Sequence, residues 1–413
     1  MRRDVVTVDA LVVGAGPAGL AAATALKSGG AGTVVVVDRE DEAGGTPRLC
    51  EHTGFGIRDI RRVLTGPVYA RRWVDRAVAC GVEIRTRTMV TGWAAPGRAE
   101  VTGPTGVLEV DARTVVLATG ARERPRAARL VPGTRPAGIF TTGQLQHWVY
   151  REHRPVGRRA VIVGAEHVSY SAVMTLRHAG VHPVALVTDL PRPQSYRLFD
   201  FSVRVGLRVA VWTGTSVAGI FGRDRVDRVL VRGPGGDERS VAVDTVVFSG
   251  DFIPDNELAR LAGLSIDPGT RGPACAAGGV TTAAGVFAAG NVVHPAETAD
   301  VAAQRALSVG RAAAEWLRQN GDRTAPGATE RVLVADPLHW VVPNRADPAR
   351  PGVDPVLIRS RVFLDHPRVV VTQGGRLLAS HRLRNMIPNR SQHIPSDWWG
   401  RVRPDEDVLI SVS

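Results

Sequence analysis

The chain has 413 residues, of which 44% are hydrophobic and 22% are charged. This size and composition predict a globular protein of two or three domains and exclude collagen-like, coiled-coil and disordered chains. Its cysteines, Cys50, Cys80 and Cys275, are too few and too far apart for a disulfide framework, a CxxC redox pair, a four-cysteine zinc site or an iron–sulfur cluster. We therefore expect a protein of the reducing cytoplasm that has no metal site.

The formal net charge is +12, and all but one of the 52 basic residues are arginines, since Lys27 is the single lysine. The arginines are scattered along the whole chain, which is not typical of a phosphate-binding face, so we expect no nucleic-acid partner. No stretch has the roughly 18 uninterrupted apolar residues of a membrane-spanning helix, so we expect no membrane span.

The first elements in chain order predict a βαβ unit. Residues 6–13 predict a buried strand, residues 20–27 a helix of small residues, and residues 33–37 a β-branched strand that ends at Asp38. Strand, glycine turn, helix and strand in this order are typical of a parallel sheet. A helix and then further strands are predicted at residues 57–80, 82–85, 88–93, 107–110 and 115–118.

A second βαβ pattern starts at residue 160, with its turn at Gly164 and a second strand that ends before Asp189. Its predicted elements are residues 161–163, 171–178, 184–187, 209–212 and 228–231. Short buried strands at 245–249 and 285–289, a helix at 301–317, a linker at 320–329 and a β-rich tail at 331–413 follow. In the tail we expect strands at 361–363, 368–372 and 376–380, with a hairpin turn at Gly374 and Gly375.

The strongest motif is the glycine turn that runs from Gly14 through Gly16 to Gly19, between a predicted strand and a predicted helix. Glycines there permit the tight turn, the approach of a pyrophosphate to the backbone and close packing of the helix on the strand. Asp38, at the end of the next strand, can accept hydrogen bonds from both hydroxyls of a ribose. This arrangement predicts a dinucleotide site.

Two further strand ends carry small residues beside that turn: residues 115–121, which contain Ala118, Thr119 and Gly120, and residues 285–291, which end in Gly290 and Asn291. Together with the first turn, this set resembles the two-dinucleotide-binding-domain flavoproteins of the pyridine nucleotide-disulfide oxidoreductase superfamily. A narrower likeness is to flavoproteins that accompany a glycerol-3-phosphate-dehydrogenase-like protein and, more distantly, to the α subunits of opine oxidase and hydrogen cyanide synthase. It rests on residues 44–48, 50–56, 64–70, 120–124, 132–141 and 291–294.

The resemblance implies an α/β fold with two Rossmann-like three-layer domains, the second inserted in the first, and a small β-rich C-terminal domain. The FAD-binding domain is expected at 1–155 and 244–325, the NAD(P)-binding-like domain at 156–243 and the C-terminal domain at 331–413. Asn291 stands where relatives carry a carboxylate that binds the ribityl chain, and its amide can still form such a hydrogen bond. The residues expected to contact FAD are Gly14, Gly16, Pro17, Ala18, Gly19, Asp38, Arg39, Gly45, Thr46, Arg48, Val90, Ala118, Thr119, Gly120, Gly290, Asn291 and Thr298.

The second turn departs from the pattern, because Glu166 and Ser169 occupy its second and third glycine positions. A side chain at the second position obstructs a pyrophosphate, and a carboxylate there repels it. Asp189 is still placed to bind a ribose. Two interpretations stay open: a domain that binds NAD(P)H, and a scaffold that kept the fold and lost the nucleotide. The second is slightly favoured.

Three residues are candidates for chemistry beside the flavin: His52, Cys50 and His294. His52 can donate or accept a proton, and Cys50 can act as a lone thiolate in contact with the flavin ring. His294 precedes a helix whose relatives point its N-terminus at the flavin. For each there is a plainer alternative: a packed or solvated loop histidine, a small buried residue, and a capping or structural histidine.

We therefore expect a FAD-dependent oxidoreductase whose donor is NAD(P)H or a small amine or hydroxy acid. One alternative is an electron-transfer subunit that works with a second flavoprotein subunit in a heteromeric dehydrogenase. Another is a flavin-binding scaffold without turnover.

Overall fold

The computed structural model describes residues 4–413 except 197–199, 296, 320–329, 348–354 and 405, so the predicted linker lies outside the described residues. The chain forms two compact units. Unit 1 comprises Met1–Arg48, Gly54–Ala121 and Pro254–Ser413, and unit 2 comprises Leu49–Thr53 and Arg122–Ile253. These bounds do not coincide with the predicted domains, whose limits stay a prediction.

Unit 1 begins with a mostly parallel sheet of strand order β5-β2-β1-β8-β7-β6, in which β19 also pairs with β8. The strands are β1 (Val5–Val13), β2 (Val34–Val37), β5 (Glu83–Arg85), β6 (Met89–Ala95), β7 (Arg98–Gly103), β8 (Gly106–Leu117) and β19 (Val286–Ala288). The helices are α1 (Pro17–Ser28), α2 (Gly66–Ala79), α6 (Glu257–Leu261) and α7 (Ala299–Arg318). Short strands β3 (Thr53–Phe55) and β4 (Leu64–Thr65) lie before α2.

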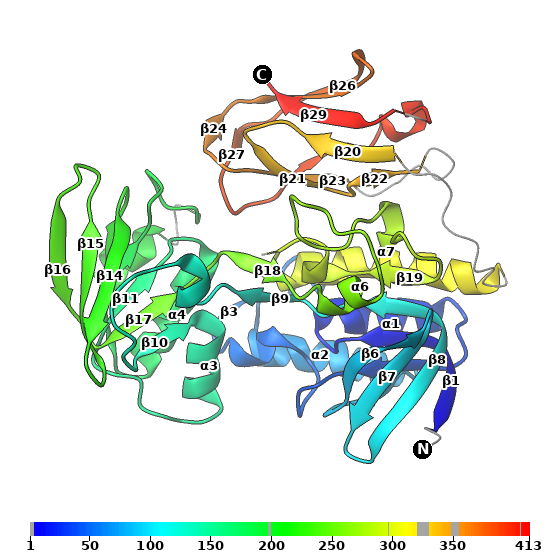
Figure 1. Cartoon of the computed structure of the whole chain (residues 1–413), viewed down its shortest axis with the longest axis horizontal. Coiled ribbons are helices and arrows are strands. Elements are labelled where there is room, and N and C mark those ends of the chain that lie inside the picture. The colour runs from blue at the N-terminus through cyan, green and yellow to red at the C-terminus, as the bar shows by residue number, and fades with distance from the viewer. Residues whose placement is uncertain (1–3, 197–199, 296, 320–329, 348–354, 405) are drawn as a thin grey trace. The chain divides into compact units, whose positions relative to one another are not determined.

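The alternation of side chains along β1 gives this part its layers. Ala10 and Val12 are buried against the side that carries α1, α2 and α7, whereas Leu11 and Val13 pack on the opposite face with β6, β7 and α6. Helices α1 and α7 run beside each other beneath the sheet (Figure 1). The structure thus has the helix–sheet–strand layering that positions the first glycine turn at the carboxyl end of β1.

The rest of unit 1 is β-rich, as predicted for the tail. One sheet has the order β22-β20-β29-β25-β26, a second β21-β23-β28, and β24 pairs with β27. Their bounds are β20 (Glu330–Val334), β21 (Leu338–Val342), β22 (Arg345–Ala346), β23 (Val356–Ser360), β24 (Leu364–Asp365), β25 (Arg368–Gln373), β26 (Arg376–Arg382), β27 (Asn385–Met386), β28 (Gln392–Ile394) and β29 (Val408–Val412). Trp398 and Trp399 stack in the core of this region.

Unit 2 contains a five-stranded parallel sheet of order β10-β17-β11-β12-β13 and a three-stranded antiparallel sheet, β14-β15-β16. The strands are β10 (Ile139–Thr141), β11 (Arg159–Val163), β12 (His182–Val187), β13 (Ala210–Trp212), β14 (Ser216–Gly222), β15 (Val226–Arg232), β16 (Glu238–Ala242) and β17 (Thr245–Phe248). Its helices are α3 (Thr142–Tyr150) and α4 (His167–His178). The chain crosses between the units within β9 (Ala121–Glu123) and β18 (Phe252–Pro254).

The predicted fold class, two Rossmann-like α/β parts and a β-rich tail, is confirmed. The predicted helix at 57–80 starts only at Gly66, because Pro67 fits the first turn of a helix and the preceding segment forms bends and β4. Residues 361–363 are not a strand and instead connect β23 to β24. None of the helices in the described ranges combines the length and apolar character that a membrane crossing requires.

Candidate functional site

The first glycine turn follows β1 in unit 1 and has the conformation that a nucleotide cradle needs. Gly14 has a φ of +107°, and its N–H donates to the carbonyl of Val37 at 2.8 Å. A side chain at Gly14 would collide with the carbonyl oxygen of Ala118, and one at Gly19 would collide with the carbonyl oxygen of Gly14. Glycine at both positions therefore lets α1 and β8 approach the turn closely.

Space remains open beside the middle of this turn. Gly16 is the N-cap of α1 and provides no side-chain cap, so the first N–H groups of α1 are available to a ligand. A side-chain carbon at Gly16 would have the Cα of Gly45 as its nearest neighbour, at 3.9 Å. At Gly120, a side-chain carbon would meet no atom within 4 Å. The residues of this turn fit a diphosphate group.

Asp38 lies at the carboxyl end of β2, beside the same turn. Its Oδ2 accepts from the N–H of Ala15 at 2.6 Å, and its Oδ1 accepts from the N–H of Glu40 at 2.9 Å. These bonds fix the carboxylate, and each oxygen keeps a further lone pair for a ribose hydroxyl. The position of Asp38 fits its predicted role.

Two other predicted segments reach the first turn. A side-chain carbon at Gly45 would lie 2.8 Å from the Cα of Gly16, and one at Gly290 would lie 2.5 Å from the Cβ of Ala18. The turn, the Gly44–Gly45 segment and the residues after β19 are therefore within contact distance, although they are far apart in sequence.

The remaining predicted contact residues have structural partners of their own. Thr119 donates its hydroxyl to the carbonyl of Asp255 at 2.7 Å, and the carboxylate of Asp255 pairs with Arg39 at 3.5 Å. Arg48 pairs with Glu42 at 3.0 Å. Pro17 begins α1, Thr46 lies in a short 3₁₀ turn, and Val90 and Ala118 are buried in or beside the sheet.

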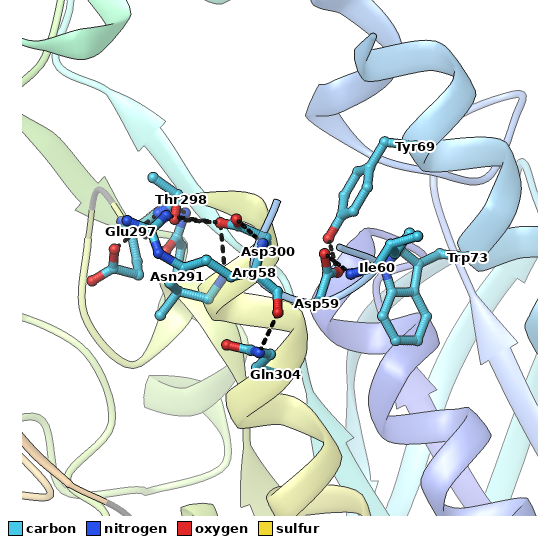
Figure 2. Close-up of polar contacts among 11 residues, drawn as sticks. Arg58, Asp59, Ile60, Tyr69, Trp73, Asn291, Glu297, Thr298, Asp300 and Gln304 are labelled. Atoms are coloured by element: carbon cyan, nitrogen blue, oxygen red, sulfur yellow. Dashed lines mark hydrogen bonds and ion pairs between the residues drawn. The ribbon is translucent and has the colours of Figure 1, made fainter. Parts of the chain in front are cut away.

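Asn291 holds the chain ahead of α7 rather than presenting a free amide (Figure 2). Its Oδ1 accepts from the N–H of Glu297 at 3.1 Å, and its Nδ2 donates to the carbonyl of Glu297 at 3.2 Å. Thr298, the N-cap of α7, donates its hydroxyl to Asp300 at 2.6 Å. The amide expected to bind the ribityl chain thus has both of its polar atoms engaged in a loop clamp.

Three acidic and basic residues that the sequence analysis did not single out fix the segment after β3 (Figure 2). Arg58 binds the buried carboxylate of Asp300 through its backbone N–H at 3.2 Å and its guanidinium at 3.5 Å. Asp59 accepts from the hydroxyl of Tyr69 at 2.6 Å and from the indole of Trp73 at 3.0 Å. Burial and the neighbouring Asp59 raise the pKa of Tyr69. No local motif marks these pairings.

His294 lines a small cavity in unit 1, together with Glu297 and Arg305, next to Gly290. The cavity of about 40 Å³ has room for about three water molecules. The His294 ring is 4% exposed and lies 5.0 Å from the ring of Trp340. Burial, and then the charges of Arg305 and Arg359, hold the pKa of His294 well below its usual range, so the ring is neutral at pH 7.

Cys50 and His52 belong to unit 2, where a hydrogen-bonded chain joins them. The Nδ1 of His52 lies 2.9 Å from the carbonyl of Thr53, which only accepts, so Nδ1 carries the proton and Nε2 accepts from the Ser171 hydroxyl at 2.7 Å. Ser171 accepts from Gln146 at 2.8 Å, and Gln146 accepts from the thiol of Cys50 at 3.7 Å. Burial raises the pKa of Cys50 to about 12, so the geometry favours a protonated thiol over the thiolate considered from the sequence.

The second glycine turn, in unit 2, does not fit a pyrophosphate as the first turn does. Gly164 again has a positive φ, +137°, but the side chain of Glu166 lies against it, with Oε2 at 2.8 Å from where a Gly164 side chain would begin. Ser169, at the third glycine position, is fully buried. Asp189, at the end of this unit's second strand, is exposed.

Several curated proteins are similar to this chain. A subunit of opine oxidase from Agrobacterium tumefaciens (strain Ach5) is 28% identical over 321 residues, which cover 68% of this chain and 61% of that protein. The alpha subunit of sarcosine oxidase from Rhizobium meliloti (strain 1021) is 30% identical over 269 residues, which cover 61% of this chain and 25% of that protein. The chain therefore spans less than two thirds of the length of these relatives.

Among solved structures, thioredoxin reductase of T. acidophilum shares the fold. Its TM-score is 0.62 at 21% identity, and the match covers 76% of this chain and 98% of that one. The family model for pyridine nucleotide-disulphide oxidoreductases matches residues 8–306. With the glycine turns, the sheet order and this match in agreement, the chain belongs to the pyridine nucleotide-disulphide oxidoreductase family, whose members are FAD-dependent oxidoreductases that also use NAD(P)H.

Proposed function

We propose that this protein is the FAD-carrying component of an oxidoreductase that oxidises a small amine or hydroxy acid together with a second flavoprotein subunit. The observation that carries the FAD assignment is the open first turn: Gly16 has no side chain and no close neighbour, and Asp38 is fixed beside it. A diphosphate and its adjoining ribose require this combination of donors and acceptor.

In this proposal, the residues of unit 1 bind and orient the cofactor. The first N–H groups of α1 donate to the diphosphate, and Asp38 accepts from the ribose hydroxyls. The absence of side chains at Gly45, Gly120 and Gly290 leaves room for the cofactor to pass close to the backbone. When bound, FAD supplies the chemistry of accepting a hydride and passing electrons onward.

The polar contacts before α7 position the loop that follows Gly290. Asn291 clamps the backbone of Glu297, and Arg58 neutralises the buried carboxylate of Asp300 in the first turn of the helix. A carboxylate near a helix N-terminus is favoured by the helix dipole. We propose that this clamp holds the segment rigidly while the cofactor changes its charge.

The second subunit is proposed from the comparisons. Relatives of this chain are named as subunits of opine and sarcosine oxidases, and the chain spans only part of their length. Their names also supply the donor class, since opines and sarcosine are amines that carry a carboxylate.

Anaerobic reduction tests this function. The FAD-loaded protein is mixed with a series of small amines and hydroxy acids, alone and after co-purification with any flavoprotein that binds it, and flavin absorbance is followed by stopped flow. We expect reduction only in the mixed preparation. Reduction of the isolated chain by the same donors would instead support a self-sufficient enzyme, and no reduction in either preparation would support a flavin-binding scaffold.

A further inference from the structure

The two glycine turns have the same backbone. Gly14 and Gly164 both have positive φ, and their N–H groups donate to Val37 and Val187, each at 2.8 Å. The residue two positions later caps the helix in each case, with φ −77° and ψ 178° at Gly16 and φ −98° and ψ 179° at Glu166. Any residue adopts this conformation, so the side chain alone distinguishes the two positions.

The side chain of Glu166 folds back into its own turn. It is 9% exposed, and its Oε1 accepts a short hydrogen bond from the hydroxyl of Ser249. Ser249 in turn accepts from the hydroxyl of Ser169 at 3.1 Å. A side-chain carbon at Gly250 would lie 2.8 Å from the carboxyl carbon of Glu166, so the carboxylate lies between the backbones of Gly164 and Gly250.

The carboxylate therefore occupies the space that stays open in the first turn. It lies at the N-terminus of α4, where a helix stabilises negative charge, and it has hydroxyl donors of its own. Arg129 fixes the adjoining strand end, because its guanidinium donates to the carbonyls of Ser249 at 3.0 Å and Gly250 at 2.7 Å. An internal anion thus makes contacts of the kind that a bound phosphate would make.

The segment after β12 closes the same turn from the other side. Gln194 donates its N–H to the carbonyl of Ala165 at 3.0 Å and is 2% exposed. The hydroxyl of Ser195 lies 2.8 Å from the Nδ1 of His167, the first residue of α4. In unit 1 the corresponding bond joins Gly44 to Ala15 at 2.8 Å, and glycine follows at position 45. Side chains cover the second turn where glycines leave the first one open.

We propose that Glu166 closes the second turn from within, so that unit 2 does not bind NAD(P)H and reducing equivalents enter from another donor. The first half of this inference stands on the geometry of unit 2 alone. The second half rests on the proposed function, because it requires FAD in unit 1. Glu166 is accordingly a residue that determines donor specificity, through the space and the charge it places where a pyrophosphate would lie.

Titration of the FAD-loaded protein with NADH and with NADPH, followed by nucleotide fluorescence, tests the inference. We expect no saturable binding to the wild type. E166G removes both the side chain and its charge at a backbone that glycine tolerates, and we expect it to bind at least about tenfold more tightly than the wild type. E166Q keeps the volume and a hydrogen bond to Ser249, so we expect it to stay closed.

Wild-type protein that binds NADH or NADPH at micromolar concentration would overturn the inference. So would an E166G protein that keeps the wild-type thermal-unfolding midpoint and still binds neither nucleotide. The flavin absorbance of each sample is recorded first, so that a failure to hold FAD, which would contradict the proposed function, is distinguished from an unexpected nucleotide site in unit 2.

Discussion

The glycine turn of unit 1 and that of unit 2 share a backbone conformation, but they differ in what fills the space beside it. Gly16 leaves that space open, and Glu166 fills it with a hydrogen-bonded carboxylate. The comparison teaches that a Rossmann-like turn is a scaffold for phosphate binding and that one side chain decides whether the scaffold is available. It also separates fold from function within one chain, since both turns are well formed.

The largest expected effect comes from giving the first turn the side chain of the second. G16E introduces a carboxylate at a φ of −77°, which glutamate tolerates, into the space proposed for the diphosphate. We expect FAD affinity to fall at least about hundredfold through steric exclusion and charge repulsion, as measured by flavin fluorescence titration.

G16A is the matched control, because a methyl group would meet only the Cα of Gly45, at an ordinary contact distance of 3.9 Å. It is expected to keep the apoprotein's unfolding midpoint and to weaken FAD binding less than G16E does. Equal FAD content in wild type and G16E would break the comparison between the turns.

The two acidic residues that end the second strands sharpen the comparison at a smaller scale. Asp38 is hydrogen-bonded into the open turn, whereas Asp189 is exposed beside the closed one. D38N removes the charge that accepts from ribose hydroxyls, and we expect about a tenfold loss of FAD affinity. D189N is expected to leave FAD affinity unchanged; an equal loss in both variants would argue against the assignment of Asp38.

A histidine in unit 1 predicts a pH effect on stability. Burial holds the pKa of His294 well below 6.5, so the unfolded chain binds a proton more readily than the folded one. The stability that the neutral ring contributes is therefore present above about pH 6.5 and is lost as the pH falls from there towards the folded-state pKa.

The measurement is the thermal-unfolding midpoint between pH 7.5 and pH 5. H294Q cannot gain this proton, and we expect its midpoint to fall less steeply with decreasing pH than that of the wild type. H182Q, at an exposed histidine in unit 2, should follow the wild-type profile. Parallel profiles for wild type and H294Q would contradict the prediction.

The cysteines give the smallest effect and show what the units have in common. Burial raises the pKa of Cys50 in unit 2 and of Cys275 in unit 1 to about 12 each. At pH 8, a chromogenic disulfide reagent should therefore label only the partly exposed Cys80 in the native protein and all three thiols after unfolding. C80A should abolish native labelling, and rapid labelling of Cys50 would revive its candidacy as a reactive thiolate.

The sequence predicted the order of the elements around both turns, because glycine, small residues and β-branched runs mark strand ends and helix starts directly. It also identified Glu166 as an obstruction. It did not predict that the carboxylate folds inward, because its partners Ser249 and Ser169 meet it only when β17 and α4 lie side by side.

Other features of the site depend on contacts that no local pattern encodes. The clamp of Asn291 on Glu297 requires a particular loop path, and Arg58 meets Asp300 from 242 residues away. The predicted helix at 57–80 was too long because its arginines and apolar residues fit a helical period, whereas Pro67 marks where the helix can start. Long-range pairing, rather than propensity, decided these points.

The most direct test of the central assignment is the flavin content of the purified wild-type protein after incubation with excess FAD and removal of unbound cofactor by gel filtration. We predict equimolar FAD and protein from the visible absorbance, with the cofactor retained through the column. Protein that elutes without flavin absorbance although it is folded would contradict the assignment of the first glycine turn as the FAD site.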